Sequence, residues 1–303
     1  MSDRASFAVP STPASPYAGR SIWLTTLHGK ERALARPVAW GLGATLRVCA
    51  SDTNRLGTFS GDVERPADPL TTCRRKAELG LEATGASLGL ASEGSFGPHP
   101  AIPFLPVGQE VLVFIDRERQ LTVVEQHLEL RTTFASRTLQ GDGLNSVELQ
   151  HWLELVHFPS HALIVRPAPE SEASGHSGPC FKGISSPQEL HDAVLRCASH
   201  RGDGQVLLES DMRAHCNPTR MASIRRLGIA LVRRLRQHCP ACGSPGWGRG
   251  KMIPGLPCCD CGTPTALVAA EQWQCSACAH TQHRPRRDGL QQADPQHCPW
   301  CNP

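Results

Sequence analysis

The chain is poor in aromatic residues, which make up 5% of its 303 residues, and it has a single tyrosine. Few aromatics flank its basic residues, so base stacking on single-stranded nucleic acid has weak support. It also lacks any apolar run of the ~20 residues that a membrane-spanning helix requires. Residues 1–20 are rich in alanine, serine and proline and contain no apolar core of a secretory signal. We therefore expect a disordered tail over residues 1–20, no membrane association, and a cytoplasmic, bacterial protein.

Charge is unevenly distributed behind a net value of +3. Residues 1–210 contain 19 Lys or Arg and 23 Asp or Glu, whereas residues 211–303 contain 12 and 5. A basic C-terminal third suits phosphate, nucleic acid or an acidic partner, although solvated surface is the simpler interpretation.

Cysteine is concentrated near the C-terminus, unlike the dispersed cysteines of a disulfide framework. Eight of the 14 cysteines form four C-x-x-C pairs. The pairs are Cys239 with Cys242, Cys258 with Cys261, Cys275 with Cys278, and Cys298 with Cys301. Because tetrahedral zinc takes four thiolates, four pairs predict two zinc sites. All-cysteine sites leave no position for water, so the two zinc ions should be structural.

Two pairings of these motifs are compatible with the spacing. Sequential pairing joins the first motif to the second and the third to the fourth, while alternating pairing joins first to third and second to fourth. Sequential pairing keeps both loops near the usual zinc-ribbon length and is favoured on that ground. Cys259 in "CCDC" is a spare thiol.

Short aliphatic runs alternate with helical stretches over residues 21–237. This pattern predicts an α/β domain with a mixed, mostly parallel sheet and flanking helices, followed by a zinc-ribbon region over 238–303. The expected strands are 22–26, 44–49, 87–92, 110–116, 121–130, 161–165 and 205–209. The expected helices are 31–41, 69–84, 147–157, 187–200 and 218–238. Three of them begin with a capping residue before proline: Asp68-Pro69, Ser186-Pro187 and Asn217-Pro218.

Polar residues gather in three stretches that each follow a predicted strand: 25–32 ("TTLHGKER"), 91–100 ("ASEGSFGPHP") and 209–221 ("ESDMRAHCNPTRM"). Ligands of open α/β sheets bind beyond the carboxyl ends of parallel strands, so the three stretches should face one crevice. Its cations would suit phosphate and its carboxylates a hydrated Mg²⁺. The side chains are His28, Lys30, Glu93, Asp211, Arg213, His215 and Arg220. The alternatives are a turn with a solvated lysine, a glycine-rich loop without ligand, and a self-contained salt-bridge network.

The helix expected after Asn217 starts unusually. Arg220 occupies its first turn, where the helix dipole disfavours a cation. At about 100° per residue, Arg220 falls within the apolar arc that continues through Met221 and Ile224, so it should point inward. An inward arginine needs an anion, either Asp211 or a bound phosphate or carboxylate.

The chain resembles an uncharacterised bacterial family of unknown function with a cysteine-rich C-terminus. The resemblance covers about Ser21–Pro303 and implies no particular reaction. It is carried by "TTLHGKER", "GTFSGDVERP", "ASEGSFGPHPAIPF", "DMRAHCNPTRM", "CPACGSPGW" and "GLPCCDCG".

A second resemblance, over about residues 22–165, is to the inosine-triphosphate pyrophosphatase-like fold of nucleotide hydrolases. Lys30, "CRRKA" (Cys73–Ala77) and "SEGS" (Ser92–Ser95) follow the order of that fold's motifs, although "CRRKA" departs from its first alanine. By this resemblance Lys30 and Lys76 would contact phosphates, and Glu93 would hold Mg²⁺.

Two functions follow as hypotheses. The first is a phosphate-handling protein, in the specific case a Mg²⁺-dependent nucleotide hydrolase. In it His28, Lys30, Lys76, Arg213 and Arg220 bind the anion, Glu93 and Asp211 hold metal or orient water, and His215 transfers a proton. The second is a non-enzymatic zinc-ribbon module. It would bind nucleic acid or a protein through its basic end, including the outward helix arginines Arg225, Arg226, Arg233 and Arg236.

Overall fold

A computed structural model describes residues 15–50, 68–99, 101–140, 143–169, 178–200 and 202–303. Two compact units are distinguished. One comprises Ile22–Arg36 and Leu46–Leu231, and the other comprises Met1–Ser21, Pro37–Thr45 and Val232–Pro303. The motif "GTFSGDVERP" and residues 1–14 of the expected tail lie outside the described residues. Tyr17, which falls within the expected tail, is fully buried.

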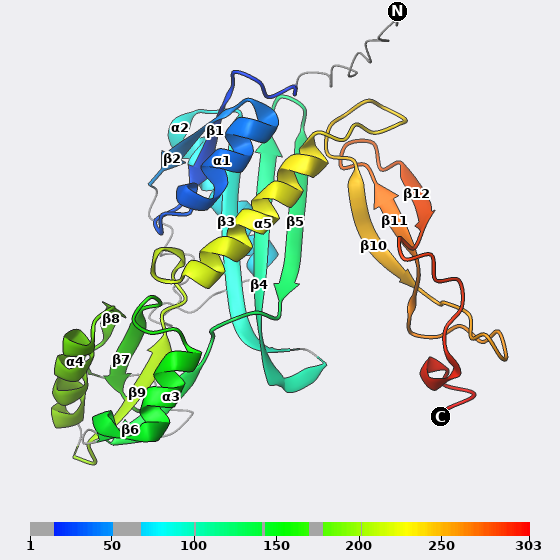
Figure 1. Ribbon diagram of the computed structural model, residues 1–303. Coiled ribbons are helices and arrows are strands. Elements are labelled where there is room, and N and C mark those ends of the chain that lie inside the picture. The colour runs from blue at the N-terminus through cyan, green and yellow to red at the C-terminus, as the bar shows by residue number, and fades with distance from the viewer. Residues whose placement is uncertain (1–14, 51–67, 100, 141–142, 170–177, 201) are drawn as a thin grey trace, which may run out of the picture. The chain divides into compact units, whose positions relative to one another are not determined.

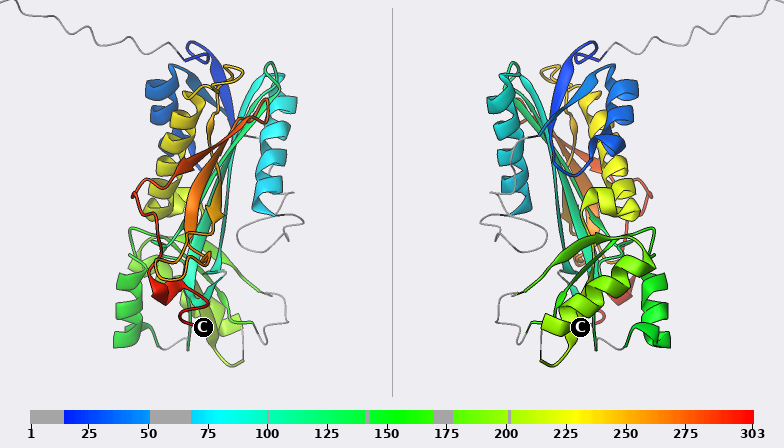
Figure 2. Two further views of the ribbon diagram at one scale, coloured as in Figure 1. Left: turned by 90° about the vertical axis from the view of Figure 1, so that its right-hand side faces the viewer. Right: turned by 90° about the vertical axis from the view of Figure 1, so that its left-hand side faces the viewer.

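The first sheet has five strands in the order β2-β1-β3-β4-β5 (Figure 1). They are β1 (Ser21–Thr25), β2 (Thr45–Cys49), β3 (Leu88–His99), β4 (Ile102–Asp116) and β5 (Leu121–Glu129). Helices α1 (Glu31–Leu42) and α5 (Pro218–Leu235) cover one face, and α2 (Pro69–Thr84) covers the other (Figures 1 and 2).

Strand alternation decides which helix each side chain of β3 and β4 meets, because successive residues point to opposite faces. Cys73, Ala77 and Leu81 of α2 pack against Ala91 of β3 and against Val111, Val113 and Ile115 of β4. The intervening residues, Ser92 and Gly94 of β3 and Glu110 and Leu112 of β4, therefore point to the face covered by α1 and α5.

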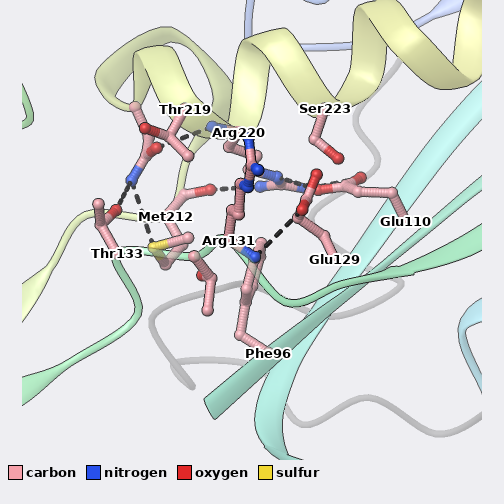
Figure 3. Close-up of a pocket in the computed structure, with 11 residues that line it drawn as sticks. Phe96, Glu110, Glu129, Arg131, Thr133, Met212, Thr219, Arg220 and Ser223 are labelled. Atoms are coloured by element: carbon pink, nitrogen blue, oxygen red, sulfur yellow. Dashed lines mark hydrogen bonds and ion pairs between the residues drawn. The ribbon is translucent and has the colours of Figure 1, made fainter.

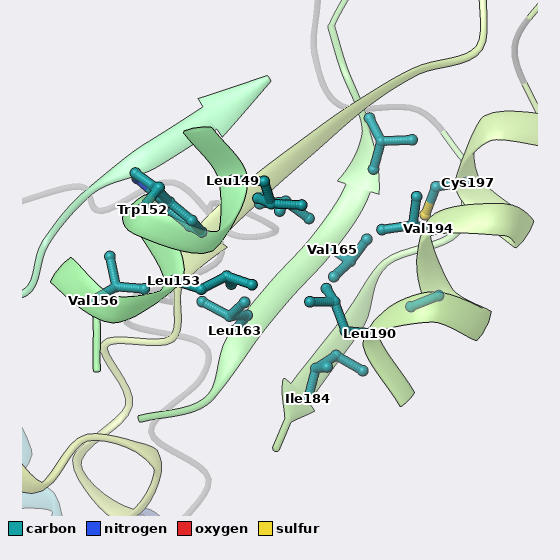
Figure 4. Packing of buried hydrophobic residues seen from close by; sticks show 13 residues of the cluster. Leu149, Trp152, Leu153, Val156, Leu163, Val165, Ile184, Leu190, Val194 and Cys197 are labelled. Atoms are coloured by element: carbon teal, nitrogen blue, oxygen red, sulfur yellow. The ribbon is translucent and has the colours of Figure 1, made fainter. Parts of the chain in front are cut away.

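A second sheet lies within residues 136–210 and has the order β6-β9-β7-β8, antiparallel throughout. Its strands are β6 (Ser136–Gln140), β7 (Leu163–Pro167), β8 (Phe181–Ile184) and β9 (Gln205–Ser210). Helices α3 (Val147–Leu155) and α4 (Pro187–His200) pack on the same face. Their apolar side chains meet Leu163, Val165, Val206 and Leu208 in one core (Figure 4).

The third sheet, in the other unit, is an antiparallel meander of β10 (Gly248–Pro254), β11 (Val268–Gln274) and β12 (Thr281–Pro285). Short 3₁₀ turns occupy Gly143–Asn145, Ala214–Cys216 and Pro295–His297. In the described part of the chain, no helix has the length and apolarity to cross a membrane.

The expected α/β class, with a mixed sheet flanked by helices, is confirmed. Parallel pairing is rarer than we expected: β1 runs parallel to β3, whereas β4 runs antiparallel to both of its neighbours, β3 and β5, and every neighbouring pair described in the second sheet is antiparallel. The reason is that β3 returns directly into β4 as a hairpin rather than through a helical crossover. The domain boundaries at 20/21 and 237/238 stay predictions.

Candidate metal centres and a buried charge cluster

The eight predicted cysteines form two quartets, each of which could hold a metal ion. One quartet consists of Cys239, Cys242, Cys275 and Cys278, and the other of Cys258, Cys261, Cys298 and Cys301. In each, two sulfurs are buried and two exposed. Cys259 is exposed and belongs to neither, as expected.

The sulfur spacing fits a tetrahedral ion. Neighbouring Sγ atoms lie 3.8 and 3.7 Å apart in the first quartet and 3.4–3.9 Å apart in the second. Zinc–sulfur bonds of about 2.3 Å set tetrahedral edges of about 3.8 Å, whereas a disulfide would need about 2 Å. Backbone N–H groups of Ala241, Ala277 and Cys301 donate to ligand sulfurs, as in zinc knuckles.

The quartets correct our preference for sequential pairing, because the first motif joins the third and the second joins the fourth. The meander explains this pairing. The turn before β10 and the turn between β11 and β12 lie at one end of the sheet, while the β10–β11 connection and the chain after β12 lie at the other. Motifs one and three, and two and four, are therefore neighbours.

The start of α5 is fully capped, as the sequence predicted for Asn217. The Asn217 Oδ1 accepts from the Arg220 backbone N–H at 2.9 Å. The Thr219 N–H donates to His161 Nε2 at 3.2 Å, and the Thr219 hydroxyl lies 2.9 Å from the same nitrogen. Burial lowers the pKa of His161, so its ring is neutral and able to accept.

Arg220 points inward, as expected, and it pairs with the carboxylate of Glu110 rather than with that of Asp211. Its Nε lies 2.6 Å from Glu110 Oε1 on β4, and both side chains are 1% exposed. The guanidinium also donates to the Met212 carbonyl oxygen and lies over the Phe96 ring. Gly94, opposite Glu110, leaves room for the pair, since a Cβ there would lie 2.3 Å from Arg220 Nη2.

A small cavity of about 10 Å³ adjoins this pair (Figure 3). Its lining residues include Thr133, Thr219 and Ser223 beside Glu129 and Arg220. Its volume suits about one water molecule, so the cavity itself is too small for a substrate.

Lys30 is the unusual member of the cluster. It is 5% exposed, and its ammonium donates to the Ser92 carbonyl at 2.6 Å and to the Ser92 hydroxyl at 3.3 Å. Among the described residues, no carboxylate lies within ion-pair distance of it. Burial and the nearby Arg220 lower the pKa of Lys30 from 10.5 to about 8. Lys30 is therefore a mostly charged, desolvated amine at neutral pH.

The two predicted histidines stack on each other. The His28 and His215 rings lie 5.4 Å apart with an angle of 18° between their planes. Burial, followed by the charge of Lys30, lowers the pKa of His28 to about 4, and burial followed by Arg213 lowers the pKa of His215. Both rings are neutral at pH 7.

Asp211 is fully buried and is held by Arg213. The Arg213 Nη2 lies 2.6 Å from Asp211 Oδ2, and its Nε and backbone N–H both lie 3.0 Å from Oδ1. This face of the first sheet thus carries three cations, two carboxylates and two neutral imidazoles. The seven residues are His28, Lys30, Glu110, Asp211, Arg213, His215 and Arg220.

Glu93 and Lys76 do not join that group. Glu93 is paired with Val111 in the β3–β4 register and points to the α2 face, where the Lys76 ammonium lies 2.5 Å from its Oε2. "SEGSFGPH", residues 92–99, is part of β3 rather than a loop after it. The sheet therefore separates Glu93 and Lys76 from the other residues of the single crevice expected from the sequence.

Glu110 and Ser92 were missed by our sequence reasoning. Glu110 begins the apolar run "EVLVFID", where a lone carboxylate on a core-facing position signals a buried partner. The predicted inward Arg220 could have been matched to it. Ser92 has no comparable signal, because Lys30 uses mainly its backbone carbonyl.

No curated protein matches the chain. A family profile described as a domain of unknown function (DUF6671) matches residues 76–303, which include the second sheet, the start of α5 and both cysteine quartets. The expected resemblance to an uncharacterised family with a cysteine-rich C-terminus is thus confirmed over that range. The chain belongs to the DUF6671 family.

Proposed function

We propose that the protein binds a phosphorylated small molecule, such as a nucleotide, at its cation cluster, which we define as His28, Lys30, Arg213, His215 and Arg220. The observation that carries the proposal is the buried Lys30 ammonium with no carboxylate partner among the described residues. Burying a charged amine is costly, and Arg220 opposes it further. A phosphate would relieve both penalties.

The other members of the cluster suit the same ligand. The Arg213 side chain is 24% exposed, His28 is half-buried and His215 is exposed, so these three can reach a ligand from solvent. Neutral imidazoles donate hydrogen bonds to phosphate oxygens without adding charge. Arg213, although bound to Asp211, keeps Nη1 for a second acceptor.

The finer hypothesis, Mg²⁺-dependent nucleotide hydrolysis, has less support. Such a reaction needs carboxylates that can bind one Mg²⁺ ion. Each candidate carboxylate is instead paired with a cation: Glu93 with Lys76, Asp211 with Arg213 and Glu110 with Arg220. Outside the cysteine quartets, the described residues bring together no group of three or more potential ligands. Binding without turnover is therefore the primary proposal, and hydrolysis is a result that the experiment below would reveal.

The test is isothermal titration of the zinc-loaded protein with orthophosphate, pyrophosphate and nucleoside mono-, di- and triphosphates, with and without Mg²⁺. We expect binding that Lys30→Met weakens at least tenfold and that Arg225→Met, at an exposed arginine of α5, leaves unchanged. Phosphate release is measured in parallel. If no compound binds, or if the two variants behave alike, the proposal fails.

We further propose that both metal ions are Zn²⁺ with a structural role. The sulfur spacing and the complete four-thiolate sets support this assignment, since no position is left for a catalytic water. Elemental analysis of protein purified without added metal should give two zinc ions per chain, and iron or copper in their place would refute the assignment.

The alternative function, binding of nucleic acid or an acidic protein, rests on α5. Arg225 and Arg233 are exposed on this helix and Arg236 is exposed directly after its end, as the helical pattern predicted, while the exposed Arg226 also contacts Glu129. Replacing the first three with glutamine should abolish salt-dependent binding of an RNA or DNA oligonucleotide without affecting phosphate titration. Unchanged oligonucleotide binding would remove this candidate.

A further inference from the structure

The β3–β4 hairpin extends beyond the rest of the first sheet. β1 pairs with β3 only as far as Ala91, and β5 pairs with β4 only from Gly108 onward. The described residues 97–99 and 102–107 therefore form a two-stranded projection, the β3–β4 arm, which Figure 1 shows reaching past the ends of the neighbouring strands. Two-stranded ribbons are marginally stable alone.

The arm has the surface of a docking element. Residues 94–109 contain no Asp, Glu, Lys or Arg. Phe104 is 89% exposed and Ile102 is also exposed, next to the exposed Pro103 and Pro106. Proline lacks the N–H that strand addition needs, so the prolines protect the β4 edge from open-ended pairing. The remaining way to bury the apolar side chains at the tip of the arm is to insert them into an apolar pocket.

The same chain offers a matching pocket on its second sheet. A groove of about 360 Å³ lies where α3 meets the start of α4. Its apolar lining consists of Leu144, Leu153, Phe158, Pro159, Pro187 and Leu190. Glu154 is its one carboxylate, and no lysine or arginine lines it. This volume suits an aromatic ring with a neighbouring proline, and the uncharged arm would bury no unpaired charge of its own there.

We propose that the α3–α4 groove receives the β3–β4 arm of a second copy of this chain. The arm does not fill the groove of its own chain, since Phe104 is almost fully exposed. In a two-fold dimer each copy gives one arm and receives one, so the contact closes on itself rather than forming a fibre. Each inserted phenylalanine buries roughly 150–250 Å².

Sedimentation velocity of the zinc-loaded, reduced full chain from 1 to 200 µM tests the proposal. We expect a concentration-dependent dimer. Phe104→Asp should raise its dissociation constant at least 30-fold, and so should Gln150→Trp, which plugs the groove at an exposed lining position. The control Trp40→Asp, at a 77% exposed position outside the arm, should remain dimeric. Because all three sites are exposed, circular dichroism should report unchanged folding.

Three outcomes would overturn the proposal. The first is a wild-type chain that stays monomeric at 200 µM. The second is a dimer that persists in both Phe104→Asp and Gln150→Trp. The third is a monomer that binds neutral phosphatidylcholine vesicles through Phe104, which would identify the arm as a membrane contact instead.

Discussion

Replacing Lys30 with methionine should change how stability depends on alkaline pH. The Lys30 pKa is about 8 in the folded chain, against 10.5 for an ordinary lysine. Between these values the unfolded chain binds more protons than the native chain, so the free energy of unfolding rises with pH. Lys30 destabilises the fold at pH 7 and ceases to do so as it loses its proton.

The magnitude follows from the two pKa values. A full shift of this size corresponds to about 3.4 kcal/mol, since one pKa unit is about 1.4 kcal/mol. Titration is incomplete at both limits, so about 2.5 kcal/mol should appear between pH 7 and pH 10. The substitution also removes hydrogen bonds, such as that to Ser92. Their loss changes the free energy of unfolding by the same amount at both pH values and therefore cancels from this difference.

Urea unfolding of wild type and Lys30→Met at pH 7, 8, 9 and 10 measures the effect. The wild-type free energy of unfolding, minus that of the variant, should increase by about 2.5 kcal/mol over this range. Zinc sites and other titrating groups are common to both proteins and drop out. A difference that stays flat within 0.5 kcal/mol, as an order-of-magnitude threshold, would mean that Lys30 titrates normally.

Three further predictions concern other parts of the molecule. Partial burial lowers the pKa of His28 to about 4, so folding disfavours its protonation; stability relative to His28→Asn should fall from pH 7 to pH 5 by about 1 kcal/mol in the same unfolding assay, since solvent screens a partly exposed ring. Glu110→Gln leaves the buried Arg220 charge without its partner and should cost about 3–5 kcal/mol, while the control Glu129→Gln, facing an exposed arginine, should cost about 1 kcal/mol or less; equal losses would contradict the buried-pair assignment. The double variant Cys242→Ser with Cys278→Ser should keep one zinc per chain by elemental analysis, because both cysteines serve one ion; loss of both ions would restore sequential pairing.

The helices were predictable from the sequence because their signals are local. Asp68 accepts from the N–H groups of Leu70 and Thr71, and Ser186 and Glu189 form the expected capping box. All five expected helices are present, with ends that differ by three residues or fewer. Capping and apolar periodicity act within a few residues, so one sequence is enough to read them.

Strands were less predictable, because their pairing is not local. β6 (Ser136–Gln140) is short and polar, and β8 (Phe181–Ile184) contains a glycine, so neither carries the apolar signal that we required. The arm of β3 and β4 contains glycines and prolines that are typical of loops. These segments are strands because partners distant in sequence supply their hydrogen bonds.

The same contrast between local and long-range features applies to the candidate site. Individual properties of residues were predictable, such as the inward direction of Arg220 and the eight cysteines that form the two quartets. Relations between distant residues were not, because Glu110 lies 110 positions before Arg220. The zinc pairing illustrates the scale involved. Roughly doubling each ligand loop costs only about 0.6 kcal/mol, so the order of the β10–β12 meander outweighs the loop-length argument.

The alternation of β3 places two charged sites back to back. Glu93 and Lys76 face α2, yet Glu93 raises and Lys76 lowers the pKa of Lys30 on the opposite face. The sheet thus prevents contact between the two sites, but the charges on one face still affect the pKa of Lys30 on the other. A charge change on the α2 face would therefore shift the pKa of Lys30 with no movement of the backbone between them.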